Sequence, residues 1–278
     1  MWRLPAPTRT AAWTYEQCIR GVQNEDLRDR LDASSPDIVT ASDAFQAAAQ
    51  SGTLATYPRA ANVGQVTGGE LSWVYTNRFA RAKSPGRVVY DEIKSAAVNG
   101  RCPMCGHRQV ATLDHYLPKA SFPALCVTPE NLIPACSDCN KQKLDAIPVN
   151  ADEVMLHPYF DDVESQPWLV AEVMQTTPPS IQFSVAAPPA WSNVLAARVT
   201  HHFESLHLST LYASQAADEL ANIRQSLADV LAAGGPAEVA AHLAQAAHSR
   251  RAARVNSWQT AMYTAIADSQ WFCSGGFA

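Results

Sequence analysis

Two stretches of the chain decide its central fold: CPMCGHRQVATLDHYLPK at residues 102–119 and NLIPACSDCNKQK at residues 131–143. Each contains a Cys-x-x-Cys pair, and the four cysteines are Cys102, Cys105, Cys136 and Cys139. Thirty residues separate the two pairs. Thiolates bind zinc well, and four of them complete a closed tetrahedral site without a position for a reacting water. The spacing therefore predicts one structural zinc that holds a short segment folded.

Two other interpretations of these cysteines stay open, namely a redox pair and four thiols without a metal. His107 has a ligand-type side chain two residues after Cys105, but with four cysteines present we expect it at the surface. The remaining cysteines, Cys18, Cys126 and Cys273, are an odd number in a chain without an export signal. They predict free thiols in a reducing compartment.

Three further residues of the two stretches carry chemistry. Asp114 and His115 end a predicted strand, and Asn140 follows Cys139 at the start of a predicted helix. If the zinc draws strand and helix together, Asp114 and Asn140 offer oxygen ligands of the kind that Mg²⁺ prefers, with Mn²⁺ as an alternative. A neutral imidazole at position 115 then stands beside the ion, where it can take a proton from water.

Over about residues 100–145, the chain resembles the HNH endonucleases and their ββα-metal fold. The resemblance lies in four features in chain order: Cys-x-x-Cys, Asp-His-x-x-Pro, Asn, and Cys-x-x-Cys-Asn-x-x-Lys. The resemblance implies that His115 is the general base, that Asn131 shapes the loop between the strands, and that Asn140 binds the catalytic metal with Asp114. Asn140 stands in place of the family's final His, which favours magnesium over nickel or zinc. The implied reaction is hydrolysis of DNA phosphodiesters to 5′-phosphate and 3′-hydroxyl ends.

A wider pattern, LDHYLPK…NLIPACSDCNKQK…LHPYFD, is similar to HNH effectors of Septu-type bacterial anti-phage systems. That likeness implies an antiviral defence role and a partner protein of the ABC/SMC-like ATPase class. Two alternatives remain open for the function. One is a non-catalytic, zinc-stabilised module that binds DNA, and the other is a nuclease directed at RNA.

The expected fold class is α+β and mostly helical, with a zinc-stapled ββα-metal motif between helical regions. We expect three regions along the chain. These are a mainly helical N-terminal region over 1–98, the zinc-bound HNH motif over 99–160, and short strands followed by helices over 161–278.

Local patterns place the elements of the first two regions. A helix is expected from a cap at Ser42 to about Gly52, and another between 86 and 100. The Gly-rich segment over 61–75 reads as a loop that leads into a helix. In the motif, short strands around 110–116 and 131–135 precede a helix capped by Ser137.

The third region begins with two predicted strands, WLVAEVM at 168–174 and SIQFSV at 180–185, joined by a Pro-containing turn. An apolar stripe over 220–231 predicts a helix that ends at Gly234-Gly235, and Pro236 can open the next one. The segment over 257–272 predicts a terminal helix.

The net charge of −5 argues against a protein that coats nucleic acid non-specifically, although a local basic patch can still bind phosphate. Candidate nucleic-acid contacts are Lys119, Lys141, Lys143, Arg78 and Arg81. Their alternative role is ordinary solvated surface, which we favour for the later cluster in HSRRAAR at 248–254. We expect packing or surface roles for His201, His202 and His207, and a structural role first for His157.

The overall composition, with 47% hydrophobic and 17% charged residues, is ordinary for a globular protein. No run approaches the ~20 apolar residues of a membrane span. The first residues, MWRLPAPTRTAAW, lack the apolar core of a signal peptide. The sequence therefore predicts a cytoplasmic protein without a membrane partner.

Overall fold

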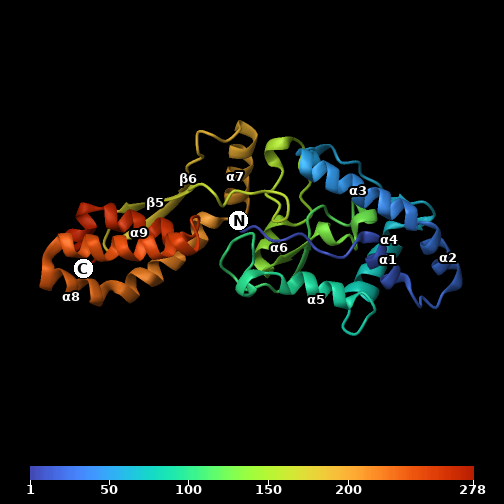
Figure 1. The fold of residues 1–278 in the computed structure, drawn as a ribbon, viewed down its shortest axis with the longest axis horizontal. Coiled ribbons are helices and arrows are strands. Elements are labelled where there is room, and N and C mark those ends of the chain that lie inside the picture. The colour runs from blue at the N-terminus through green and yellow to red at the C-terminus, as the bar shows by residue number, and fades with distance from the viewer. The chain divides into compact units, whose positions relative to one another are not determined.

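A computed structural model describes residues 1–278, which form two compact units, Met1–Asp162 and Val163–Ala278 (Figure 1). Helices dominate both units, and the strands pair only as three two-stranded sheets. This confirms the α+β, mostly helical class. No helix combines the length and the apolar character needed to cross a membrane. The three functional regions remain a prediction; in space, the first 162 residues pack as one unit.

Short helices make up most of the first unit before the cysteine motif. They are α1 (Ala11–Ile19), α2 (Glu25–Ala33), α3 (Ser35–Ser51), α4 (Gly68–Val74) and α5 (Arg87–Ser95). A π-helical segment, η2 (Tyr75–Ala80), continues α4. Single 3₁₀ turns complete the unit: η1 (Leu54–Thr56), η3 (Val98–Gly100), η4 (Pro123–Leu125), η5 (Pro129–Asn131) and η6 (Ala151–Glu153).

Two sequence predictions in this part need correction. Helix α3 begins at Ser35 and not at Ser42, because Pro36 suits the first turn and Ser42 is buried on the inner face of the helix. Its end is as expected, since Gly52 adopts the left-handed conformation with φ 73°. The Gly-rich segment is not all loop: β1 (Asn62–Val63) and β2 (Val66–Thr67) form a small hairpin before α4.

The cysteine motif is built into the core of the first unit. Strands β3 (Thr112–His115) and β4 (Leu132–Ala135) pair antiparallel, and α6 (Ser137–Lys143) follows. Leu113 and Leu132 belong to the same hydrophobic cluster as Ile38, Leu71 and Phe79 of the helices. The motif strands are thus fixed by helices that lie far from them in sequence.

The start of α6 differs from the prediction in its cap. The N-cap is Cys136, whose sulfur accepts a hydrogen bond from the Cys139 N–H at 3.4 Å, and Ser137 is the first helical residue, exposed to solvent. The thiol takes the place of the usual hydroxyl because the cysteine turn itself begins the helix.

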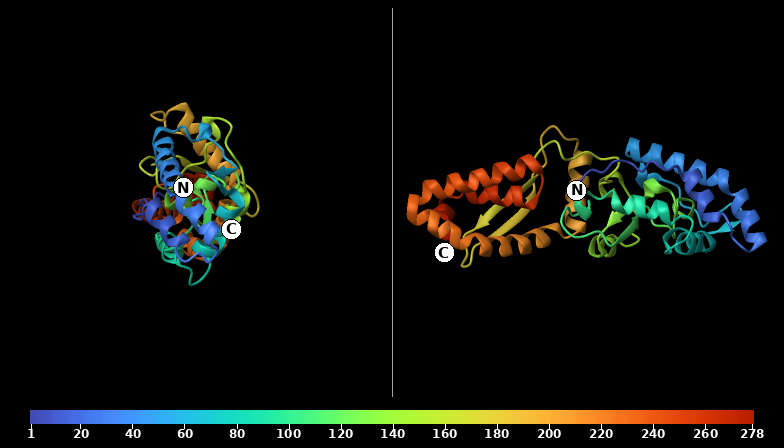
Figure 2. Two further views of the ribbon diagram at one scale, coloured as in Figure 1. Left: turned by 90° about the vertical axis from the view of Figure 1, so that its right-hand side faces the viewer. Right: turned by 60° about the horizontal axis from the view of Figure 1, so that its bottom comes forward.

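The second unit combines a hairpin with helices. Strands β5 (Leu169–Met174) and β6 (Ser180–Val185) are followed by α7 (Asn193–Ser205), α8 (Leu208–Ala253), α9 (Trp258–Asp268) and the π-helical turn η7 (Phe272–Gly276). Both strands lie where the sequence predicts them. Helix α8 consists of two helical segments (Figure 2, orange to red), because Gly235 with φ 75° breaks it directly before Pro236, at the predicted position. Helix α9 ends at Asp268, earlier than expected.

Candidate active site

The four motif cysteines lie together in the first unit. Their sulfur atoms are all within 4.8 Å of one another, all four residues are buried, and none forms a disulfide. Backbone N–H groups support two of the sulfurs, from Arg108 to Cys105 Sγ at 3.5 Å and from Cys139 to Cys136 Sγ at 3.4 Å. In a tetrahedral zinc site with Zn–S bonds of about 2.3 Å, the sulfurs stand about 3.8 Å apart. The cluster therefore fits a structural zinc.

A glycine closes the first cysteine turn. Gly106 has φ 62°, and a Cβ atom added there would lie 2.7 Å from the Trp2 indole nitrogen. The N-terminal segment is held against the same turn, since the backbone N–H of Trp2 donates to the Pro103 carbonyl at 2.8 Å. His107 is half-buried and is not among the residues whose ligand atoms gather in the cluster.

A cavity of about 470 Å³ brings together the residues predicted to carry the chemistry. Several of its lining residues are close to the motif cysteines in the sequence. Asp114 and His115 reach it from the end of β3, and Asn140 reaches it from α6. Two of the predicted phosphate-binding residues, Lys119 and Lys141, also line it. The pairing of β3 with β4, which leads directly into α6, explains why residues 25 positions apart share one wall.

The imidazole of His115 has a defined orientation. Its Nε2 lies 2.9 Å from the carbonyl oxygen of Cys126. A carbonyl only accepts, so Nε2 carries the proton and Nδ1 is left with a free lone pair. The Tyr75 ring packs edge-on against the imidazole with 4.4 Å between centroids. This hydrogen bond supplies the orienting partner that the sequence did not identify.

Burial lowers the pKa of His115 to about 3, against the opposing hydrogen bond to Cys126, and the charges of Lys119 and Lys143 lower it further. The imidazole is consequently neutral at pH 7, which is the form that can accept a proton.

A buried ion pair supports the carboxylate beside it. Lys143 Nζ lies 3.2 Å from Asp114 Oδ2 and donates a hydrogen bond to the His115 carbonyl at 2.7 Å. The two side chains are 3% and 7% exposed. Burial raises the pKa of Asp114, while the Lys143 charge opposes that shift. Asp114 Oδ2 makes this ion pair without a well-aligned hydrogen bond, and the Asp114 carboxylate lines the cavity, where it can also face a cation.

Lys143 was expected to contact nucleic acid, and its burial under Asp114 instead removes it from the surface. The substitution Lys143→Met should leave the Asp114 charge buried without compensation and lower the free energy of unfolding by about 3–5 kcal/mol. Urea denaturation measures the loss. The matched control is Lys141→Met on the same helix, where the side chain is exposed and the expected change is within about 0.5 kcal/mol. Equal effects of the two substitutions would contradict the assignment.

Asn131 lies outside the cavity lining and is fully buried behind it. Its Oδ1 accepts from the Leu117 N–H at 2.8 Å, and its Nδ2 donates to the carbonyls of Leu117 at 3.0 Å and Leu125 at 3.2 Å. These bonds tie together the two ends of the loop between β3 and β4. The geometry suits a residue that shapes this loop and does not touch a substrate.

Replacement of Asn131 by Ala should leave the buried N–H and C=O groups of Leu117 without partners, while the Leu125 carbonyl still accepts from the Thr128 N–H. Because each such group costs about 1–3 kcal/mol and relaxation recovers part of it, we expect a total loss of about 2–4 kcal/mol in unfolding free energy. Thermal or urea denaturation checks the value. Asn140→Ala serves as the control, since that side chain is only half-buried and should change stability by less than about 1 kcal/mol. A wild-type stability for the Asn131 variant would refute this role.

The predicted basic contacts of the N-terminal region do not line the cavity. The guanidinium of Arg78 donates to the carbonyls of Cys18 and Arg20, so backbone groups occupy it. Arg81 is exposed just after η2. In the second unit, Arg250 pairs with Glu219 and Arg254 with Glu164.

Some residues of the site could not be identified from the sequence. Tyr75 comes from η2, about 40 residues before His115, and Asp145 lies just beyond α6; both line the cavity. Cys126 contributes through its backbone carbonyl, which any residue type would supply. His157 is buried among Phe45, Tyr116, Tyr159 and Phe160, away from the cavity lining.

Comparisons with known proteins agree with the cysteine motif. A family model described as HNH endonuclease matches residues 102–145, which include all four cysteines and the three candidate residues Asp114, His115 and Asn140. The chain is also similar to "Protein ea31" of Escherichia phage lambda, with 30% identity over 234 residues that cover 80% of this chain and 79% of that protein. No solved structure matches the chain significantly.

Proposed function

We propose that this chain, which belongs to the family of protein ea31 of Escherichia phage lambda and contains an HNH endonuclease domain, is a metal-dependent endonuclease that hydrolyses DNA. The supporting observation is the shared cavity of Asp114, His115 and Asn140, in which the His115 Nδ1 has a free lone pair. The name of the relative gives no activity, so the proposal rests on the domain and on this geometry.

In the proposed reaction, His115 accepts a proton from water at Nδ1 while its Nε2–H stays bonded to the Cys126 carbonyl. The water oxygen forms a bond to phosphorus, and the bond from phosphorus to the leaving 3′ oxygen breaks. A magnesium ion held by Asp114 and Asn140, with Mn²⁺ as a substitute, would neutralise charge on the phosphate and on the leaving oxygen. The leaving 3′ oxygen takes a proton from a second water, so the products carry 5′-phosphate and 3′-hydroxyl ends.

The low pKa of His115 is compatible with this role once substrate is present. A phosphate brought beside the imidazole would favour the charged form and raise its pKa toward the working pH, where a general base is most effective. The Cys126 carbonyl is placed to stabilise the imidazolium that forms. Lys119 and Lys141, at the edge of the same cavity, are proposed phosphate contacts.

The four cysteines have a separate role in the proposal. They hold a structural zinc that fixes the turn before β3 to the start of α6, and a closed sulfur site contributes no reacting water. The catalytic and structural metals are therefore distinguishable by chemistry. Omission of magnesium should stop cleavage without loss of the zinc-bound fold, whereas a strong chelator such as EDTA also competes for the zinc.

One assay tests the proposed function. The purified full chain is incubated with supercoiled plasmid, single-stranded DNA and RNA, with Mg²⁺, with Mn²⁺ or with EDTA. We expect metal-dependent cutting of DNA that Asn140→Ala abolishes or strongly reduces. Cleavage of RNA alone would favour the RNA-directed alternative, and DNA retention in a mobility shift without cutting would favour the non-catalytic module.

A role in anti-phage defence beside an ABC/SMC-like ATPase stays a prediction, and no finding supports it. Co-purification of the chain with an ATPase encoded beside its gene would support such a partnership. A monomer that is fully active alone would count against it.

A further inference from the structure

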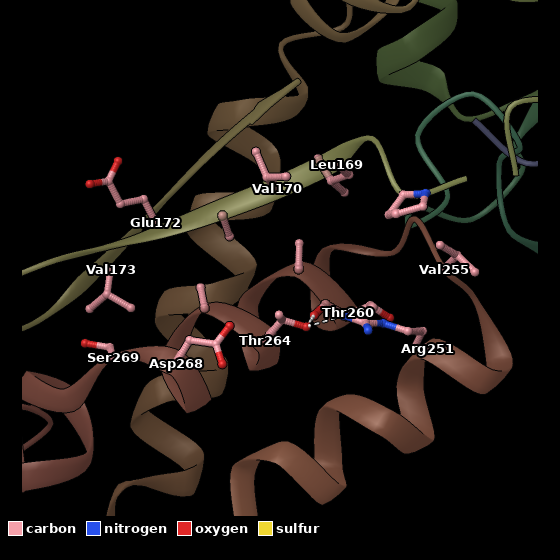
Figure 3. A pocket seen from close by; sticks show the side chains of 14 residues that line it. Leu169, Val170, Glu172, Val173, Arg251, Val255, Thr260, Thr264, Asp268 and Ser269 are labelled. Atoms are coloured by element: carbon pink, nitrogen blue, oxygen red, sulfur yellow. Dashed lines mark hydrogen bonds between the residues drawn. The ribbon is translucent and has the colours of Figure 1, made fainter. Parts of the chain in front are cut away.

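The second unit has a groove along the free edge of its hairpin. A cavity of about 410 Å³ lies between β5 and α9, within the range of about 300–1,000 Å³ that is usual for binding sites. Figure 3 shows side chains of β5 on one side of this β5–α9 groove and those of α9 on the other. No residue of the nuclease motif lines the groove.

The register of the hairpin identifies main-chain groups that face away from β6. The Ala186 N–H donates to the Trp168 carbonyl at 2.8 Å, which fixes the alternation of the antiparallel ladder. Residues 170, 172 and 174 therefore bond to β6, whereas Ala171 and Val173 direct their N–H and C=O groups outward. No hydrogen bond to those outward groups is present. They form a short template for an added strand.

The edge begins at a defined point. The side-chain oxygen of Asn256 accepts from the N–H groups of Trp168 and Leu169, at 2.8 and 3.2 Å. Asn256 also donates to the carbonyls of Val163 and Gln166, so it is held rigidly. The unpaired edge thus starts after Leu169, and an added strand would pair with the two residues beyond it.

The facing surface of α9 leaves room for a main chain. Ala261, Thr264 and Ala265 lie one turn apart on the side that lines the groove, and their small side chains keep the space open. On the strand, Val170 and Met174 are 39% and 37% exposed, which is apolar surface that an added strand could cover.

Charges at the two ends give the groove a direction. Arg251 lies toward the Val255 end, where its guanidinium donates to Thr264 Oγ1 at 3.1 Å, and it has no acidic partner, unlike Arg250 and Arg254. Asp268 lies toward the Val173 end, and neither it nor the exposed Glu172 has a basic partner (Figure 3). These unpaired charges favour a bound segment with a basic residue at the Asp268 end and an acidic residue at the Arg251 end.

We propose that the β5–α9 groove binds an extended segment of a partner protein as a third strand, antiparallel to β5. In this direction the segment enters near Val173 and leaves near Leu169. It should carry a basic residue in its first half, opposite Asp268 and Glu172, and an acidic residue in its second half, opposite Arg251. Main-chain bonds to Ala171 and Val173 provide affinity, and these charges select the partner.

A second copy of the chain fits the edge less well. Pairing that uses both Ala171 and Val173 across a twofold axis puts Glu172 opposite Glu172 of the other copy, and like charges directly opposite are destabilising. A register shifted toward the start of β5 would need the Leu169 N–H, which Asn256 already engages. A register shifted the other way would pair Val173 with Val173 and run past the end of β5 at Met174.

The test uses random peptides of about 12 residues displayed on phage and selected against the immobilised full chain. We expect enriched sequences with alternating β-branched residues, a basic residue before them and an acidic residue after them. Synthetic peptides of the enriched sequence should bind with dissociation constants on the order of 10 μM in fluorescence anisotropy. A peptide with its two charges exchanged should bind at least about tenfold more weakly.

Two variants locate the binding. Ala265→Leu fills the groove with a good helix former and should weaken peptide binding at least about tenfold. Ala267→Leu is the matched control, because it lies on the same helix, is also partly buried and does not line the groove. Circular dichroism confirms that both variants fold.

Val173→Pro is a second variant that removes an outward N–H but no ladder bond, and it should also weaken binding. Absence of any enriched peptide, or equal binding to the wild type and to Ala265→Leu, would overturn the proposal. Sedimentation experiments test the remaining alternative. If the wild type forms dimers and Val173→Pro does not, the occupant of the groove is a second copy of the chain, and the proposed partner segment is wrong. Each of these results leaves the nuclease proposal for the first unit unaffected.

Discussion

Replacement of His115 by Ala is expected to reduce DNA cleavage by about 10²–10⁴-fold, the usual contribution of a general base. Initial rates of plasmid nicking at saturating Mg²⁺ measure the effect. His115→Gln is the sharper variant, because its amide can still donate to the Cys126 carbonyl but cannot accept a proton from water. Zinc content and the circular dichroism spectrum should stay at the wild-type level in His115→Gln.

The control for this pair is His107→Ala, which changes a half-buried histidine near the cysteine turn that lies outside the cavity. It should retain cleavage within about threefold, as expected for a residue that touches neither substrate nor reacting atoms. Full activity in His115→Gln would show that another group accepts the proton, and the proposed mechanism would then be wrong.

The same histidine should make the fold sensitive to acid. Its pKa is about 3 in the folded chain and about 6.5 when unfolded, so the folded state disfavours protonation. The associated stability is fully present above the unfolded value and is lost as the pH falls from about 6.5 toward 3. Urea titrations across this range should show a smaller decline for His115→Gln than for the wild type.

Cys139→Ser is expected to abolish zinc binding and to unfold the motif. Structural zinc contributes about 10–16 kcal/mol to the folding of small zinc domains, more than a typical domain's whole stability. Because Leu113 and Leu132 share the hydrophobic cluster of the surrounding helices, the damage should extend through the first unit. Metal analysis, circular dichroism and limited proteolysis record these changes.

Cys273→Ser is the matched control for the cysteine prediction. Cys273 is a buried free thiol of the second unit whose sulfur donates to the Ile266 carbonyl, a bond that a serine hydroxyl can also make. This variant should keep its zinc and its fold. A Cys139→Ser protein with wild-type stability and no zinc would show that the cluster does not hold the motif together.

Much of the candidate site could be predicted from the sequence because its residues lie in two short segments joined by the cluster of four cysteines. The spacing of the cysteines, the Asp-His pair and the Asn after Cys139 are local features. Pairing of β3 with β4 turns that local order into one cavity wall. The HNH domain and the mostly helical α+β class follow from such patterns of spacing and periodicity.

Other features depended on contacts between distant segments. The start of α3 was mispredicted because Ser42, a good cap by residue type, is buried against the core, where packing outweighs local propensity. Lys143 looks like a surface cation in the sequence, yet the structure uses it as the counter-ion of Asp114. The burial of the Lys143 side chain depends on tertiary packing, so no local sequence pattern indicates it.

The sequence by itself determined which side chains can bind metal and accept a proton, since ligand type and spacing are fixed by the chain. Only the tertiary structure decided the protonation of His115. Burial, to which the Tyr75 ring contributes, lowers its pKa and favours the neutral form, and the Cys126 carbonyl fixes the remaining proton on Nε2. Likewise only the hairpin register left Ala171 and Val173 unpaired beside α9. Desolvation and hydrogen-bond partners depend on which surfaces meet in space, and residue order specifies these only through the complete fold.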